Sequence, residues 1–199
     1  RLAEKFGVKQ VFRDHRQMLQ EAEVDAVAIV TPDFVHGVIA VDCANAGKHI
    51  LLENPLATTR ADVEAILEAV KRNNVRMMVD LHNRWSPPFA VAKRSLDNGE
   101  LGQPYSAYIR LGSHSVDTLR WFFNDEVKRV YSVSRKGLLA SHGIDTADIF
   151  HTVLEFERGG IATMENGWIT PNGHPCINDI KFNNQGTKGM ISLDLSNSQ

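Results

Sequence analysis

The first half of the chain alternates short apolar runs with amphipathic stretches. Residues 25–30 form a continuous apolar run bounded by polar residues, which is the pattern of a buried strand. Apolar positions recur at helical spacing over 34–46 and 60–72, and further apolar runs at 48–52 and 75–80 predict two more strands. A strand–helix–strand–helix–strand order predicts a parallel sheet, because such crossovers are right-handed and long enough for a helix. We therefore predict an α/β fold for this part.

Beyond residue 83 the alternation gives way to separate helices and a series of extended segments. The predicted helices span 89–97 and 114–123. The predicted extended segments span 104–111, 127–134, 149–157, 160–168 and 178–183. Arg158-Gly159-Gly160 lies between two of these segments and predicts an antiparallel hairpin. We therefore predict two domains, a parallel α/β domain over 1–82 and an α+β domain with a mainly antiparallel open sheet over 83–199.

Composition excludes several classes of function. The 199 residues are 43% hydrophobic and 23% charged, which is typical of one or two soluble globular domains. A net charge of −2 without runs of like charge argues against a nucleic acid or an anionic membrane as partner. No apolar segment approaches the roughly 20 residues of a membrane span. Cys43 and Cys176 are far apart, which favours buried thiols in a reducing cytoplasm, and no metal-ligand spacing predicts a metal site.

Polar residues followed by proline end two of the predicted strands. Thr31-Pro32 follows the first apolar run, and Glu53-Asn54-Pro55 follows the second. Proline stops a strand because it has no N–H to donate and restricts the residue before it. Ligands of α/β proteins bind at the carboxyl ends of the parallel strands. These two turns are therefore predicted to line a nucleotide-binding cleft.

The order and spacing of six short motifs resemble the glucose–fructose oxidoreductase / inositol dehydrogenase / MocA family of NAD(P)-dependent oxidoreductases. The matching segments are Val24-Asp25-Ala26-Val27, Thr31-Pro32 with His36, Ala46-Gly47-Lys48-His49, Glu53-Asn54-Pro55, Asn83-Arg84-Trp85, and His114-Ser115-Val116-Asp117 with Arg120-Trp121. The resemblance covers nearly the whole chain. It implies that the first domain is the C-terminal portion of a Rossmann-type domain that binds NAD or NADP. It also implies a sugar or polyol substrate, and a homodimer or homotetramer formed through the open sheet of the second domain.

The resemblance assigns the cofactor-binding residues. It places Thr31, Pro32 and His36 around the nicotinamide ribose, and Glu53, Asn54 and Pro55 at the neighbouring turn. It brings Asn83, Arg84 and Trp85 near the cofactor as well. From the residues alone, the less favoured alternative is that His36 is an ordinary residue at a helix start. The segment 83–85 is equally a contact between the two domains.

The resemblance also assigns the catalytic residues. It implies that His114 accepts the proton of the substrate hydroxyl and that Asp117 contacts the substrate. It also implies a catalytic place for Asn54, in the cleft between the nicotinamide and the substrate. On a first helical turn, the Asp117 carboxylate shares a face with the His114 imidazole and can orient it. The alternative from the residues alone is that His114 caps the helix while Asp117 pairs with Arg120. Trp168 either lines the substrate pocket or packs in the core.

Several residues depart from the family pattern. Asn54 stands where the family has Lys, and Arg110 stands where the family has an acidic residue four positions before the histidine. The glycine-rich phosphate loop of a dinucleotide fold is absent. We therefore expect further residues before Arg1 and between Arg110 and Leu111, and give Arg110 no catalytic role.

Two functions remain open. One is an NAD(P)-dependent oxidoreductase acting on a sugar, cyclic polyol or related hydroxy or keto compound. The other is a non-catalytic dinucleotide-binding relative, in which Asn54 marks lost chemistry. The enzyme is favoured because His114 and Asp117 are retained.

Overall fold

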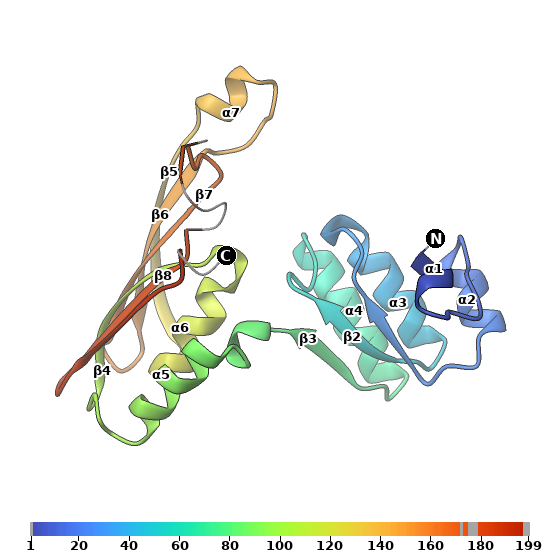
Figure 1. Ribbon diagram of the computed structural model, residues 1–199, viewed down its shortest axis with the longest axis horizontal. Helices are drawn as coiled ribbons and strands as arrows, with labels where there is room; N and C mark the ends of the chain where they lie inside the picture. Colours follow the sequence, from blue (N-terminus) through green and yellow to red (C-terminus); the bar gives the residue numbers. More distant parts are fainter. Residues whose placement is uncertain (1, 172, 175–178, 197–199) are drawn as a thin grey trace. The chain divides into compact units, whose positions relative to one another are not determined.

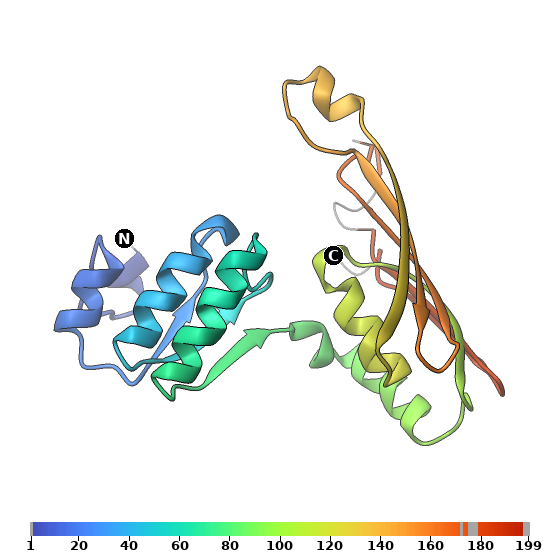
Figure 2. The same cartoon turned by 180° about the vertical axis from the view of Figure 1, so that it is seen from behind.

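The computed structural model describes residues 2–171, 173–174 and 179–196. The chain divides into two compact units, residues 1–80 and residues 81–199 (Figures 1 and 2). The division predicted from the sequence lies two residues later. None of the described helices combines the length and the apolar character that a membrane span requires.

The N-terminal unit contains a three-stranded parallel sheet in the order β1-β2-β3. The strands are β1 (Ala26–Ile29), β2 (His49–Glu53) and β3 (Met77–Asp80). Two helices, α3 (His36–Asn45) and α4 (Arg60–Arg72), lie side by side on one face of this sheet (Figure 2). The shorter helices are α1 (Leu2–Lys5), α2 (His15–Glu21) and the 3-10 helix η1 (Asp33–Val35). The parallel sheet predicted from the apolar runs is confirmed.

The core of the N-terminal unit lies between this sheet and α3 and α4. Its fully buried members are Ile29, Ala40, Cys43, Ala44, Ile50, Leu52, Ile66 and Ala69. Helix α4 begins where the Thr59 side chain accepts a hydrogen bond from the backbone N–H of Asp62, and this satisfies one N–H that the helix cannot. Burial, with a smaller contribution from Asp42, raises the pKa of Cys43 to about 11. Cys43 is thus a packed thiol, as predicted, whereas Cys176 lies outside the described residues.

The C-terminal unit packs two helices on one face of a six-stranded sheet (Figure 1). The sheet order is β5-β6-β7-β4-β8-β9, and β4 and β7 pair in parallel while the other pairs are antiparallel. The strands are β4 (Pro104–Arg110), β5 (Val127–Arg135), β6 (Ile149–Phe156), β7 (Ile161–Gly167), β8 (Lys181–Gly186) and β9 (Met190–Asp194). The helices are η2 (His82–Arg84), α5 (Pro87–Asp97), η3 (Gly112–His114), α6 (Ser115–Phe123) and α7 (Leu138–Ser141).

Aromatic rings fill the core between the two helices and the sheet. Phe122 of α6 lies edge-on to Phe182 of β8, with ring centroids 4.5 Å apart. Phe123 stacks on Phe156 of β6 with the ring centroids 4.3 Å apart. Gly160, in the turn between β6 and β7, leaves room for this stack, because a Cβ there would lie 2.4 Å from the Phe123 ring. The predicted β6–β7 hairpin is confirmed.

The chain passes from β4 to α6 through Leu111 and the 3-10 helix η3 (Gly112–His114). Leu111 is 8% exposed and joins the core, and Gly112 has φ +59°, a conformation that glycine adopts without strain. In this chain Leu111 and Gly112 fit the connection, and the expectation of further residues between Arg110 and Leu111 stays a prediction.

Candidate functional site

The polar turns predicted as cofactor-binding lie together at one edge of the N-terminal sheet. In the parallel register, Ile29 is opposite Leu52 and Glu53 is opposite Asp80, so the three strands end at similar heights. Thr31-Pro32 follows β1, and Asn54-Pro55 follows β2 at the same edge. Glu53, Asn54 and Pro55 are all half-buried. The structure therefore brings these predicted residues together, at the sheet edge where α/β folds bind ligands.

His36, at the start of α3, lies between these two turns. Its side chain is buried, with the residue 1% exposed. Its Nδ1 lies 2.8 Å from the carbonyl oxygen of Pro55, and its Nε2 lies 2.9 Å from that of Thr31. Both ring nitrogens thus face backbone oxygens. This geometry favours a role for His36 in holding the turns, rather than the predicted direct contact with a cofactor.

In the C-terminal unit, η3 and the first turn of α6 carry His114 and Asp117. His114 is half-buried, and its ring meets that of His82 edge-on with the centroids 4.4 Å apart. His82 belongs to η2, which precedes α5, so the two rings come from segments 32 positions apart in the sequence. His82 was not predicted as a site residue. Its one sequence signal is its place directly before Asn83-Arg84-Trp85.

Arg84 and Asp117 form a bidentate ion pair between η2 and α6. Nε of Arg84 donates to Oδ2 of Asp117 at 2.9 Å, and Nη2 donates to Oδ1 at 2.6 Å. The hydrogen bond to Asp117 is the main cause that raises the pKa of Arg84. The guanidinium also lies over the Trp121 ring, 5.6 Å from its centroid. The alternative that Asp117 pairs with Arg120 is wrong, because Arg120 binds Glu126 at 2.5 and 2.7 Å.

The remaining predicted residues differ in their surroundings. Asn83 is half-buried, and its Nδ2 makes no hydrogen bond within the described part of the chain. Trp85 is 72% exposed, so its predicted place near a cofactor stays a prediction. Trp168 is 78% exposed, so the alternative that it packs in the core is wrong. Its predicted contact with the substrate also stays a prediction.

Arg110 lies in a polar cluster of the sheet. Its Nη1 donates to Oδ2 of Asp179 at 2.5 Å and lies 3.6 Å from Oε1 of Glu165. The Tyr108 hydroxyl donates to Oε2 of the same Glu165 at 3.0 Å. Burial first, then this hydrogen bond, raises the pKa of Tyr108 to about 12. Arg110 therefore has a structural part in the sheet, which agrees with the decision to give it no catalytic role.

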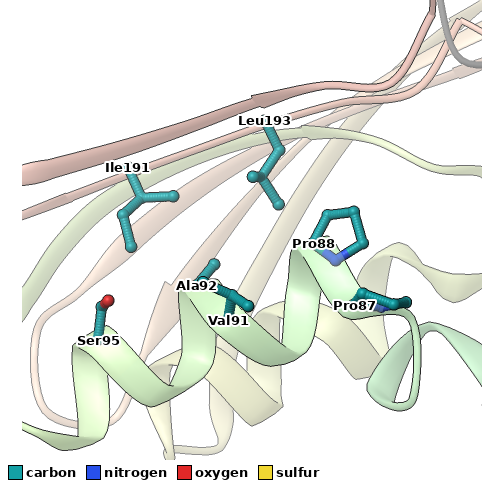
Figure 3. A pocket seen from close by; sticks show the side chains of 7 residues that line it. All are labelled: Pro87, Pro88, Val91, Ala92, Ser95, Ile191 and Leu193. Carbon is teal, nitrogen blue, oxygen red and sulfur yellow. The ribbon is translucent and has the colours of Figure 1, made fainter.

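His114 does not line either of two hollows in the C-terminal unit. An apolar hollow of about 430 Å³ lies between α5 and β9 and is lined by Pro87, Pro88, Val91, Ala92, Ser95, Ile191 and Leu193 (Figure 3). It has no titratable side chain in its lining. A polar hollow of about 590 Å³ is lined by Arg84, Lys93, Arg120, Trp121, Asn124, Asp125, Glu126 and Arg158. Each cation of this second hollow is already paired with a carboxylate.

Comparisons with known proteins give one family for both units. Residues 1–81 match the model of the oxidoreductase family with an NAD-binding Rossmann fold. Residues 106–192 match the model of the GFO/IDH/MocA C-terminal domain. The chain belongs to the GFO/IDH/MocA oxidoreductase family. The resemblance found from the motifs, and the α/β fold with its Rossmann-type sheet, are thereby confirmed.

Curated GFO/IDH/MocA relatives include several polyol and sugar dehydrogenases. Myo-inositol 2-dehydrogenase of Thermotoga maritima is 27% identical and is matched over 97% of this chain and 63% of its own length. Inositol 2-dehydrogenase 2 of Saccharopolyspora erythraea is 32% identical, over 92% of this chain and 58% of its own. Levoglucosan dehydrogenase of Pseudarthrobacter phenanthrenivorans is 30% identical, over 96% of this chain and 50% of its own length. The chain thus spans between half and two thirds of the length of these relatives.

Solved structures of the family have the same fold. A levoglucosan dehydrogenase in complex with NADH and levoglucosan superimposes with a TM-score of 0.84 and 27% identity, over 97% of this chain and 60% of that one. Myo-inositol 2-dehydrogenase from Lactobacillus plantarum gives a TM-score of 0.85 at 20% identity, over 96% and 63%, and this likeness shows the fold alone.

Proposed function

We propose that this GFO/IDH/MocA protein is an NAD(P)-dependent oxidoreductase that oxidises a secondary hydroxyl of a sugar or cyclic polyol, or reduces the corresponding ketone. The observation that carries the proposal is the arrangement at the start of α6, where His114 meets His82 and Asp117 is held by Arg84. Two histidines and a fixed carboxylate suit the exchange of a proton with a hydroxyl. The names of the relatives, which are inositol and levoglucosan dehydrogenases, support a substrate of this class.

The N-terminal unit supplies the residues that would hold the cofactor. They are the strand-end residues Thr31 and Pro32 after β1, and Glu53, Asn54 and Pro55 at the end of β2. The carboxyl edge of a parallel sheet fits a dinucleotide, because such folds bind it there. A nicotinamide cofactor, when bound, accepts or donates the hydride. NAD is proposed ahead of NADP because relatives are named for NAD(+) or described in complex with NADH.

The C-terminal unit supplies the proton acceptor. The His114 imidazole accepts the proton of the substrate hydroxyl while the carbon of that hydroxyl loses a hydride. Asp117 accepts a hydrogen bond from a neighbouring hydroxyl, and the two hydrogen bonds from Arg84 fix the direction of its carboxylate. His82 supports the His114 ring from the side. Trp85 and Trp168 offer exposed apolar surface for a sugar ring.

Asn54 favours a second candidate, the non-catalytic dinucleotide-binding relative. Its amide can donate to and accept from a hydroxyl, but it cannot carry positive charge or relay a proton. We prefer the enzyme because both proposed catalytic side chains of the C-terminal unit are held by a partner. His114 contacts the His82 ring, and Asp117 accepts hydrogen bonds from Arg84.

We also propose that the protein forms a homodimer or homotetramer through the open face of the C-terminal sheet. Alternation along β6 buries Thr152, Leu154 and Phe156, whereas Val153, between Thr152 and Leu154, is 37% exposed. Its neighbour on β5, Tyr131, is 69% exposed, and Val133 is 50% exposed. A face with this many exposed apolar side chains suits a second copy. The cytoplasmic location stays a prediction from the cysteine usage.

The test is turnover of the His114→Asn variant, followed by nicotinamide absorbance with myo-inositol, scyllo-inositol and levoglucosan. We expect a loss of about two to four orders of magnitude, the usual range for a positioned general base. His142→Asn is the matched control, because His142 follows α7, is exposed and bonds to the Leu138 carbonyl. Equal turnover in wild type and both variants would overturn the assignment of His114. Nucleotide binding without turnover in any of the proteins would favour the non-catalytic candidate.

A further inference from the structure

Trp121 is the aromatic residue of the Arg120-Trp121 motif on α6. It lies four positions after Asp117, so the two side chains share a face of the helix. The indole is half-buried and packs against the core of the C-terminal unit, edge-on to Phe122 with the ring centroids 5.3 Å apart. The same ring lines the polar hollow. One part of the indole is thus fixed by the core while another part meets polar side chains.

The Arg84 guanidinium contacts both Trp121 and Asp117. It lies over the indole, 5.6 Å from the ring centroid, which is within the range of a cation–π attraction. Its Nε and Nη2 donate to the two carboxylate oxygens of Asp117 at 2.9 and 2.6 Å. A bidentate pair needs the guanidinium in one orientation, because both N–H groups must point at the carboxylate together. The ring contact therefore acts on the group that sets the direction of Asp117.

The place of Arg84 in the chain leaves its side chain with freedom to move. It belongs to η2, a helix of only three residues, and the side chain is 38% exposed. A long arginine side chain has many rotamers, and holding one of them costs conformational entropy. An aromatic face restricts these rotamers by contact and attracts the cation at the same time. Trp121 thus favours the rotamer in which Arg84 reaches Asp117.

The charges around Arg84 act in opposite directions. The hydrogen bond to Asp117 is the largest influence and raises the pKa of Arg84, whereas the like charge of Arg120 opposes this shift. Trp121 attracts the guanidinium through its ring and adds no charge that would compete for Asp117. The indole therefore stabilises the ion pair without offering either partner an alternative.

We propose that Trp121 is a positioning residue that acts through Arg84, because its indole face holds the guanidinium in the orientation that gives Asp117 both hydrogen bonds. The consequence for the substrate rests on the proposed function, whereas the hold on Arg84 does not. A cation–π contact at a partly exposed site shifts an equilibrium by about fivefold. Loss of the indole is therefore expected to raise the population with an open Arg84–Asp117 pair by about fivefold.

The first measurement is hydrogen exchange of the Arg84 Nε–H in nitrogen-15-labelled protein, because this exchange requires the pair to open. The NMR signal is identified by its loss in Arg84→Met. Exchange is expected to be about fivefold faster in Trp121→Leu than in wild type, and intermediate in Trp121→Phe, which keeps a weaker aromatic face. Exchange no faster than in wild type would refute the proposal, whether in a folded Trp121→Leu protein or, if that variant does not fold, in Trp121→Phe.

The second measurement separates an action through Arg84 from a general loss of packing. The kcat/KM for polyol oxidation is compared in wild type, Trp121→Leu, Arg84→Met and the double variant. A partly exposed ion pair opens often, so Trp121→Leu is expected to lower kcat/KM about twofold in the wild-type background. It should cause no further loss in Arg84→Met, where the guanidinium is already gone. Equal losses in both backgrounds, or none in wild type, would contradict the proposal.

The matched control removes the other cation over the same ring. Nζ of Lys93 lies 5.9 Å from the Trp121 centroid, and this side chain pairs with Asp97. Lys93→Met leaves the indole in place, so both Arg84 exchange and kcat/KM should equal those of wild type. Changes as large as in Trp121→Leu would overturn the assignment to the Trp121–Arg84 contact. If wild type turns over no polyol, the proposed function fails, and the exchange of Arg84 alone still decides for or against the role of Trp121.

Discussion

Removal of Arg84 is predicted to destabilise the C-terminal unit and to slow turnover. Arg84→Met keeps most of the aliphatic stem over Trp121 but removes the guanidinium. The Asp117 carboxylate, whose side chain is 17% exposed, then loses two charge-assisted hydrogen bonds at 2.6 and 2.9 Å. A shielded carboxylate without its donors is costly, because water reaches it poorly.

The magnitude follows from the exposure of the two partners. A hydrogen bond to a charged group contributes about 1.5–3 kcal/mol when it is buried. The Arg84 side chain is 38% exposed, so solvent screens part of the ion pair. We therefore expect the free energy of unfolding to fall by about 2 kcal/mol, rather than by the sum of two fully buried hydrogen bonds. Turnover is expected to fall about tenfold, because Asp117 no longer holds one direction toward the substrate.

Arg120→Met provides the matched control on α6. Arg120 pairs with Glu126 at a similar distance, but the side chains are 45% and 67% exposed, so solvent screens this pair and the loss of stability should be clearly smaller than in Arg84→Met. Urea unfolding of wild type and both variants gives the free energies, and nicotinamide absorbance gives the rates. Equal losses of stability in the two variants, or unchanged turnover in Arg84→Met, would refute the reasoning.

Three further predictions concern single side chains. Asn54→Lys should raise turnover about ten- to a hundredfold, because a lysine cation stabilises a developing alkoxide by roughly 1.5–3 kcal/mol more than the asparagine amide does. Equal turnover in wild type and variant would show that position 54 takes no part in the proton transfer. Tyr108 should ionise at pH about 12 in ultraviolet titration, and Tyr108→Phe should remove that step. Since the folded pKa of Tyr108 lies above the ordinary value of 10, its stabilising contribution is complete below pH 10 and is lost as pH rises through about 12. Ionisation of Tyr108 near pH 10 would contradict this prediction. Asn184→Leu should raise the free energy of unfolding by about 1 kcal/mol, because a buried amide without hydrogen bonds costs stability. Asn184 is 0% exposed, and neither amide atom has a hydrogen-bond partner within residues 2–171, 173–174 and 179–196. A lower free energy of unfolding in the variant would show that the amide is hydrogen-bonded.

Local signals predicted the elements of the chain well. Helix α4 begins and ends at the predicted residues, because Thr59 is a strong N-cap and the apolar stripe has helical spacing. The β6–β7 hairpin follows from its glycine turn. The short helices α2 and α7 were not predicted, since four to seven residues give too little periodicity to recognise.

Pairings between distant segments could not be read from the sequence. Strand β4 pairs with β7 on one side and β8 on the other, and no local pattern specifies this order. The strand β9 was not predicted either.

The same limit applies to the candidate site. The motifs found His114, Asp117 and Arg84, but the ion pair joins positions 33 apart, and the alternative drawn from the residues alone paired Asp117 with Arg120 instead. The partners of His36 are backbone carbonyls, which leave no trace in the sequence. The motif therefore marked His36 as a site residue without showing how it acts.

The most direct test of the central claim follows deuterium from substrate to cofactor. The protein is incubated with NAD and with inositol or levoglucosan deuterated at every ring carbon, and the nicotinamide is analysed by mass spectrometry. The proposed function predicts reduced nicotinamide that carries one deuterium, formed by wild type and about two to four orders of magnitude more slowly by His114→Asn. Measurable cofactor binding with no deuterium in the nicotinamide, for any of these substrates, would contradict the claim that the protein is an oxidoreductase acting on polyols.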